Sequence, residues 1–136
     1  SLVTKTIHPD IAIVFEGCPA DDTFQPNWMV QSALRKGPML RHFDCSMITN
    51  PRYQRYALDL AEEKGILAQE SVRSGGGTNG AMLHMANNGT PSIVIGIPVR
   101  YIHSMNCITS YFDFEATVNV VQTLLENLTP EQIKKF

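Results

Sequence analysis

The 136-residue sequence lacks long hydrophobic runs, has no strongly basic region and contains few cysteines. Its longest apolar runs have the length of a strand, which excludes a membrane-spanning helix and argues against a membrane partner. A formal net charge of −2 without a basic patch argues against nucleic acid as a partner. The three cysteines, Cys18, Cys45 and Cys107, are far apart and form no C-x-x-C motif, so we expect a reduced, cytoplasmic chain that buries them as small apolar side chains.

The first residues lack both an initiator methionine and the pattern of a signal peptide. We therefore expect the chain to be a fragment of a longer protein. A hydrophobic content of 43% over this length supports one core, so residues 1–136 are expected to form part of a single domain.

Two apolar, β-branched runs, Ile11–Phe15 and Ile93–Ile97, predict buried strands. Neither run alternates with polar residues, which is typical of central strands in a parallel sheet. Two further strands are predicted at residues 38–43 and 67–72. Four helices are predicted at residues 50–64, 81–86 and 113–128 and from residue 130 onward. The alternation of helices and strands predicts an α/β fold, a three-layer α/β/α sandwich with a mostly parallel sheet.

The helix ends carry recognisable signals. Asn50 before Pro51 is typical of an N-cap, and Thr129 before Pro130 begins a capping box. Asp113 is expected to cap the long helix, whose apolar stripe is predicted to comprise Val118, Val121, Leu124, Leu125 and Leu128.

Two candidate metal ligands follow the two apolar runs. Glu16 comes at the end of the first run, and His103 comes soon after the second. Loops that leave parallel strands meet at one edge of a sheet, so we expect these side chains to lie within the span of one metal site. A carboxylate and an imidazole suit Zn²⁺, Co²⁺ or Mn²⁺, although a lone histidine after a strand is also compatible with a structural role. Asp21 or Asp22, in a long loop, could also turn inward.

The segment Ser74–Gly80 contains four glycines in seven residues and precedes a short helix. It is compatible with a flexible connector, with an anion-binding nest or with backbone that approaches a substrate closely. It lacks the lysine of a P-loop and the spacing of a dinucleotide-binding motif, which disfavours phosphate binding. His84, among apolar neighbours, is expected to be structural.

Three segments together, Ile11–Gly17, Ser74–Ala81 and Gly96–Ser104, resemble the co-catalytic metallo-aminopeptidases, which comprise glutamyl aminopeptidases and tetrahedral or deblocking aminopeptidases. Some members are labelled endoglucanases. The resemblance covers the C-terminal portion of the family's catalytic domain. The family's His-x-Asp segment, bridging Asp and Glu-Glu pair have no counterpart here, and the general-base Glu is expected upstream of Ser1.

The resemblance implies two divalent metal ions, Zn or Co, in each complete site. Glu16, where the family usually has Asp, and His103 would be metal ligands, and this chain alone would contain no catalytic residue. The resemblance also implies that a loop beside the substrate comprises Gly76, Gly77, Thr78 and Asn79. Asn79 stands where many relatives have Asp, which leaves a charged role for that position in doubt.

The parent protein would remove N-terminal residues from peptides through a water activated by two metals, and the isolated chain would be inactive. The family also implies other protomers of a homo-oligomer as partners. Exposed apolar loop residues would form part of such contacts, namely Trp28, Met29, Tyr101, Met105, Tyr111 and Phe112.

Two other functions remain open from the sequence. One is a non-catalytic remnant that serves assembly, and the other is glycoside hydrolysis. The second would need a pair of carboxylates on either side of a sugar, for which Asp21 and Asp22 in one loop give no support.

Overall fold

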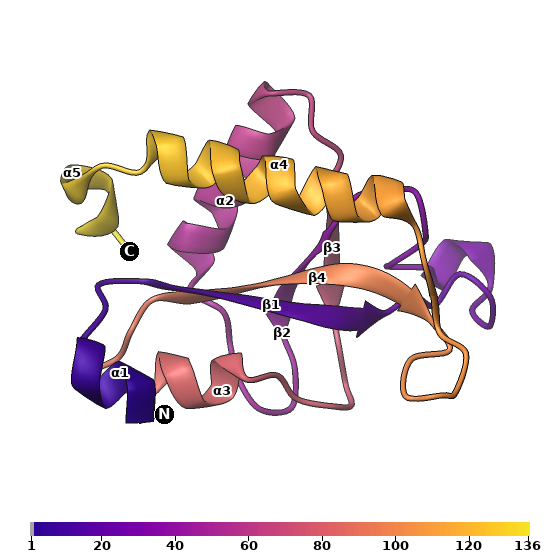
Figure 1. The fold of residues 1–136 in the computed structure, drawn as a ribbon, viewed down its shortest axis with the longest axis horizontal. Helices are drawn as coiled ribbons and strands as arrows, with labels where there is room; N and C mark the ends of the chain where they lie inside the picture. The colour runs from indigo at the N-terminus through magenta and orange to yellow at the C-terminus, as the bar shows by residue number, and fades with distance from the viewer. Residues whose placement is uncertain (1) are drawn as a thin grey trace.

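The computed structural model describes residues 2–136, apart from the side chain of Val3 (Figure 1). In chain order the elements are α1 (Leu2–Ile7), β1 (Ala12–Pro19), the 3₁₀ helix η1 (Asn27–Met29), β2 (Met39–Phe43), α2 (Pro51–Glu63), β3 (Gln69–Val72), α3 (Gly80–His84), β4 (Ser92–Arg100), β5 (Ile108–Thr109), α4 (Tyr111–Asn127) and α5 (Pro130–Ile133). The sequence did not predict α1. Over the described residues, every helix is too short or too polar to cross a lipid bilayer.

The sheet lies between two layers of helices. Figure 1 shows α2 and α4 on one face and the short helices α1 and α3 on the other. This arrangement confirms the predicted three-layer α/β/α architecture.

The sheet is mixed, with the strand order β1-β4-β2-β3 and β5 paired to β4. The two longest pairings, β1 with β4 and β2 with β3, are parallel. The pairings of β2 and β5 with β4 are antiparallel and short. The prediction of a parallel sheet therefore holds for the two long pairings. The strands β2 and β5, which also pair with β4, run antiparallel to it.

The central position of β4 is confirmed, because Ile93, Val94 and Ile95 are fully buried. The same prediction for β1 is wrong within the described residues, where β1 pairs only with β4 and lies at an edge. Phe15 on β1 is 55% exposed. Phe15 thus marks a surface that this part of the chain leaves uncovered, while Val14 of the same run is buried.

The larger core lies between the sheet and the helices α2 and α4. It comprises Leu40, Tyr53, Ala57, Leu58, Leu60, Ala61, Ile93, Ile95, Val120 and Leu124. A smaller cluster of Val14, Met47 and Val94 lies on the other face of the sheet. Since each strand residue alternates between faces, β4 contributes to both clusters.

Two of the predicted helix caps are confirmed. The Asn50 side chain accepts hydrogen bonds from the backbone N–H groups of Arg52 and Tyr53, and the Thr129 side chain accepts one from Gln132. Asp113 is not the cap of α4, because Ser110 occupies that position. The fully buried Asp113 carboxylate instead accepts the N–H groups of Arg35 and Gly37, each at 2.8 Å.

The predicted apolar stripe of α4 is only partly correct. Leu124 is fully buried, but Val118 and Leu125 are exposed, and the core side of the helix includes Val120 in their place. Val118 and Leu125 line a groove of about 560 Å³ beside Phe15. Part of the predicted stripe, Val118 and Leu125, therefore faces the edge strand β1 and not the core.

Candidate functional site

The two candidate ligands lie in or after two neighbouring parallel strands. Glu16 lies in β1, and His103 follows β4. Glu16 is in register with Gly96, and the ladder continues from Gly17 and Cys18 to Pro19. The prediction that Glu16 ends its strand is therefore wrong. Glu16 lies inside β1, because the polar and small residues after it remain paired with β4.

His103 follows β4, which runs beyond the predicted boundary at Pro98 to Arg100. It lies in the turn that leads back to β5, is exposed and has a left-handed φ of 64°. Arg100 lies four residues beyond Gly96, on the order of 13 Å along the strand. Within residues 2–136 no hydrogen bond or ion pair joins His103 to Glu16, and no group of three or more His, Cys, Asp or Glu side chains is placed to hold a metal.

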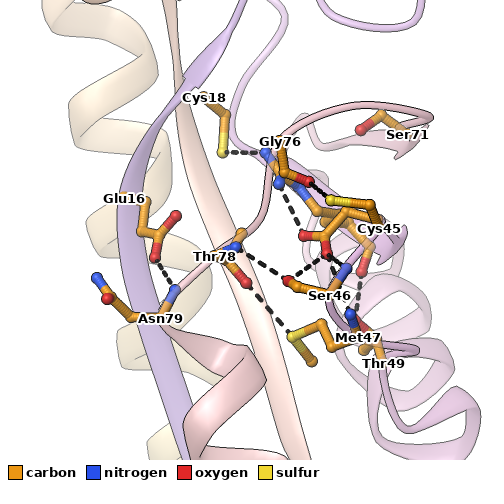
Figure 2. A network of polar contacts seen from close by, with 12 residues as sticks. Glu16, Cys18, Cys45, Ser46, Met47, Thr49, Ser71, Gly76, Thr78 and Asn79 are labelled. Atoms are coloured by element: carbon orange, nitrogen blue, oxygen red, sulfur yellow. Dashed lines mark hydrogen bonds and ion pairs between the residues drawn. The ribbon is translucent and has the colours of Figure 1, made fainter.

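The structure instead brings Glu16 to the glycine-rich loop. One carboxylate oxygen of Glu16, Oε1, accepts the backbone N–H of Asn79 at 2.6 Å (Figure 2). Asn79 immediately precedes α3, and its side chain caps no N–H group of that helix. The contact with Glu16 therefore uses the backbone of Asn79, which an Asp at this position would also provide.

The loop rests on the turn that follows β2. The Cys45 thiol donates a hydrogen bond to the Gly76 carbonyl at 2.6 Å, and the Ser46 hydroxyl accepts the Thr78 N–H at 3.3 Å (Figure 2). A Cβ atom on Gly77 would lie 2.8 Å from the Ser46 Oγ. Glycine at position 77 is therefore a requirement of close packing, whereas a flexible connector would not need it.

A buried ion pair lies beneath this turn. Arg41 Nη1 donates to Asp44 Oδ2 at 2.9 Å, and Arg41 Nη2 donates to the Cys18 thiol at 3.3 Å. Asp44 Oδ1 accepts the N–H groups of Ser46 and Met47 and the Ser46 hydroxyl. Burial by itself would raise the pKa of Asp44, but the hydrogen bonds from Ser46 and Arg41 outweigh it and hold the pKa below its ordinary value.

Cys18 is buried as expected, whereas Cys45 and Cys107 are exposed, so the prediction of three buried thiols is wrong for two of them. Burial raises the pKa of the Cys18 thiol, although the neighbouring Arg41 acts in the opposite direction. Cys18 is therefore an un-ionised hydrogen-bond partner at neutral pH.

Asp21 and Asp22 hold the long loop in place. The buried Asp21 carboxylate accepts the N–H groups of Gln31 and Ser32 and forms an ion pair with Arg73 at 2.8 Å. Asp22 accepts two hydrogen bonds from Arg100 and one from the Leu34 N–H. Both carboxylates therefore hold the loop in place through these bonds.

Three polar residues of the site were not predicted from the sequence, namely Arg41, Asp44 and Ser46. A charged residue within the predicted strand 38–43 was the available signal, because an arginine in an apolar strand needs a buried partner. Asp44 and Ser46, directly after that strand, also fit a side-chain-stabilised turn. His84 is half-buried, and its Nδ1 lies 3.1 Å from the Gly80 carbonyl, as expected for a structural residue.

The six apolar residues predicted to contribute to assembly are all exposed, with Trp28 at 83% and Met105 at 100%. Their predicted place in loops is wrong for four of them, which lie in η1 and at the start of α4. A second, smaller apolar pocket lies between the ends of β1 and β4 and is lined in part by Phe24, Val99 and Tyr101. The C-terminal ends of these two strands therefore present apolar surface.

Comparison with known proteins identifies similar sequences and structures. The family model of the M42 glutamyl aminopeptidase matches residues 1–120. The chain is 32% identical to the glutamyl aminopeptidase of Lactococcus lactis over 133 residues, which are 98% of this chain and 36% of the relative. The chain therefore spans little more than a third of the length of that relative.

Two solved structures are also similar. The TET aminopeptidase of a marine sediment archaeon of the Thaumarchaeota matches with a TM-score of 0.93 at 34% identity, over 98% of this chain and 37% of that one. The TET1 peptidase of Pyrococcus horikoshii, which can assemble into a tetrahedron or a large octahedral shell, matches with a TM-score of 0.75 at 25% identity, over 93% of this chain and 36% of that one.

Proposed function

Because the chain belongs to the M42 glutamyl aminopeptidase family, we propose that the whole protein is a metal-dependent aminopeptidase. Residues 1–136 would form the C-terminal portion of its catalytic domain. The family match over residues 1–120 is the observation that carries this proposal. Peptides with a free N-terminus are the proposed substrates.

Glu16 and His103 are the proposed metal ligands in this chain. A carboxylate and a neutral imidazole match the ligands that Zn²⁺ and Co²⁺ take in proteins. Glu16 is half-buried and His103 is exposed, and the strands β1 and β4 that position them are parallel neighbours. Two ligands are fewer than a catalytic zinc requires, so the remaining ligands would come from outside residues 1–136.

Two divalent metals, when bound, lower the pKa of a shared water and polarise the scissile carbonyl. The residues of this chain would then contribute by placing groups around that chemistry. Asn79 donates its N–H to one oxygen of the Glu16 carboxylate and leaves the other free of a bond from this N–H. The loop of Gly76, Gly77, Thr78 and Asn79 would let substrate approach its backbone, because Gly75 and Gly76 have open space where a side chain would lie.

The general base is proposed to lie outside this chain, in a Glu-Glu pair upstream of Ser1. Among the described residues, Asp21, Asp22 and Asp113 already bind arginine or backbone N–H groups. No three potential metal ligands of this part of the chain lie together. The isolated 136-residue chain is therefore expected to be inactive.

Hydrolysis of aminoacyl anilides by the full-length protein and by residues 1–136 tests this function. We expect metal-dependent turnover by the full-length protein, a loss of at least about 100-fold in Glu16→Ala and His103→Ala variants, and no turnover by the chain alone. Metal-dependent turnover by the purified chain would contradict the assignment of the general base. Full-length protein without peptidase activity would favour the alternative, a remnant that serves only assembly.

We also propose that the protein forms a cytoplasmic homo-oligomer. The similar TET1 peptidase of P. horikoshii assembles into shells, and the exposed apolar residues around Trp28 and Met105 offer contact surface. Within residues 2–136 all three cysteines are free, which fits a reducing compartment. Light scattering on the full-length protein should show an oligomer, and a monodisperse monomer would overturn this proposal.

A further inference from the structure

We infer that Asn79 and Ser46 are positioning residues that orient the Glu16 carboxylate toward the metal. The inference rests on the proposed function of Glu16 as a ligand. It assigns the orientation of that ligand to a backbone N–H and to the polar turn after β2. Figure 2 shows Ser46 of that turn facing Thr78, and Asn79 facing Glu16.

The contact that orients Glu16 is a single backbone hydrogen bond. The Asn79 N–H lies 2.6 Å from Glu16 Oε1, across 63 residues of sequence. A hydrogen bond from a partner to one oxygen of a ligating carboxylate restricts the rotation of that carboxylate and directs its other oxygen. The position of the Asn79 nitrogen therefore decides where the free oxygen of Glu16 can point.

The position of Asn79 depends in turn on Ser46. The Ser46 hydroxyl donates to Asp44 Oδ1 at 2.6 Å and accepts the N–H of Thr78, the residue before Asn79. The same side chain is the closest neighbour of Gly77, where an added Cβ would lie 2.8 Å from Oγ and 3.0 Å from Cβ. Ser46 thus holds the loop by one hydrogen bond and by direct contact.

The base of this arrangement is rigid because it is buried and charged. Asp44 has a fully buried side chain, accepts three hydrogen bonds through Oδ1 and binds Arg41 through Oδ2. The Arg41 Nε has no partner among the described residues, but separating a buried charge pair is costly, because it would leave an uncompensated charge. Three consecutive links therefore run from Asp44 through Ser46 and Thr78 to the neighbouring N–H that Glu16 accepts.

Replacement of Asn79 offers a direct test with a matched control. The φ angle of Asn79 is −62°, which proline can adopt, so Asn79→Pro removes the N–H with little change of φ at that residue. Asn79→Ala removes the side chain and keeps the N–H. We expect Asn79→Pro in the full-length protein to weaken Co²⁺ binding by about 10- to 100-fold and to change the visible spectrum of bound Co²⁺, whereas Asn79→Ala should leave both near the wild type.

A second pair of variants tests the turn without introducing proline. Gly77→Ala places a methyl group against Ser46, whereas Gly75→Ala meets no atom within 4 Å. Gly77→Ala should weaken Co²⁺ binding about tenfold, and Gly75→Ala should not. Ser46→Ala should also weaken binding, and Ser46→Thr, which keeps the hydroxyl, should restore it.

The outcomes separate this inference from the proposed function. If wild-type protein binds Co²⁺ and Glu16→Ala abolishes part of that binding, the ligand assignment stands. Equal Co²⁺ affinities and spectra for Asn79→Pro and Asn79→Ala, or for Gly77→Ala and Gly75→Ala, would then overturn the positioning role. If Asn79→Pro fails to fold, the glycine pair and the serine variants decide the question. If Glu16→Ala leaves Co²⁺ binding unchanged, the proposed ligand is wrong and the inference falls with it.

Discussion

At the scale of single residues, most buried acidic side chains of this chain hold backbone in place. Asp113 accepts two N–H groups from residues 76 and 78 positions away, and Asp21 accepts two from the far side of its own loop. Removing such an acceptor leaves buried donors unsatisfied, at a cost of about 1–3 kcal/mol for each group. Acidic residues near the candidate site therefore contribute structure even where the sequence alone suggested ligands.

Asp22 should make the stability of the protein sensitive to acid. Hydrogen bonds from Arg100 lower the pKa of Asp22 below the ordinary value of 3.8. A lowered pKa means that folding favours the ionised carboxylate, so its contribution is present above pH 3.8 and is lost as the pH falls through the folded-state pKa. Asp22→Asn should lower the free energy of unfolding at neutral pH by about 1–3 kcal/mol and reduce its decline between roughly pH 5 and pH 2.

Thermal unfolding of the full-length protein over a series of pH values measures both effects. Asp59→Asn is a suitable control, because Asp59 is exposed and pairs with Arg55 only at 3.6 Å. A variant at Asp22 with the same pH dependence as the wild type would show that the Arg100 contact does not stabilise the fold.

At the scale of elements, the helix α2 connects the sheet to the C-terminal segment through Asn50. The Asn50 Oδ1 accepts the N–H groups of Arg52 and Tyr53, while its Nδ2 donates to the Phe136 carbonyl at 2.6 Å. The Phe136 ring stacks on Tyr53 with centroids 4.6 Å apart. One side chain thus both begins α2 and holds the segment after α5 against it.

Substitutions at Asn50 should separate these two contributions. Asn50→Ala removes both and should lower the free energy of unfolding by about 1–2 kcal/mol, because capping side chains contribute about that much. Asn50→Asp keeps the cap acceptor and loses only the donor to Phe136, so it should cost less. Chemical denaturation of the full-length protein gives the comparison. Equal losses in the two variants would mean that the cap itself contributes little.

At the scale of the whole molecule, an uncovered apolar surface is the groove between β1 and α4. Phe15, Phe114, Val118 and Leu125 line it and are each at least 46% exposed. β1 also has an unpaired edge within the described residues. An apolar groove beside an open strand edge is a surface that isolated chains tend to cover by association.

The isolated 136-residue chain should therefore self-associate through this groove. A Val118→Gln, Leu125→Gln double variant should raise the monomer fraction in light scattering, because it makes the groove polar without changing the buried side of α4. Ile48→Gln is the control, since Ile48 is 76% exposed but does not line the groove. A wild-type chain that remains monomeric at high concentration would contradict this prediction.

The local signals in the sequence were sufficient for the elements that depend on neighbouring residues. The apolar run of β4, the caps at Asn50 and Thr129 and the helix–strand alternation all predicted correct features, because capping and strand burial depend on residue type and short-range hydrogen bonding. The motifs around Glu16, Asn79 and His103 were likewise sufficient to indicate the family.

Only the tertiary structure decided which distant groups meet. It placed β1 at an edge, put Glu16 inside a strand, and joined Asp113 to Arg35 and Asp22 to Arg100, each pair 78 residues apart. An apolar run predicts that its side chains are buried, but it does not indicate which element covers them. Similarly, the sequence around a polar residue does not indicate a partner that is distant in the chain, because only folding brings the two together. The roles of Asp44 and Ser46 beneath the glycine-rich loop were therefore known only from the structure.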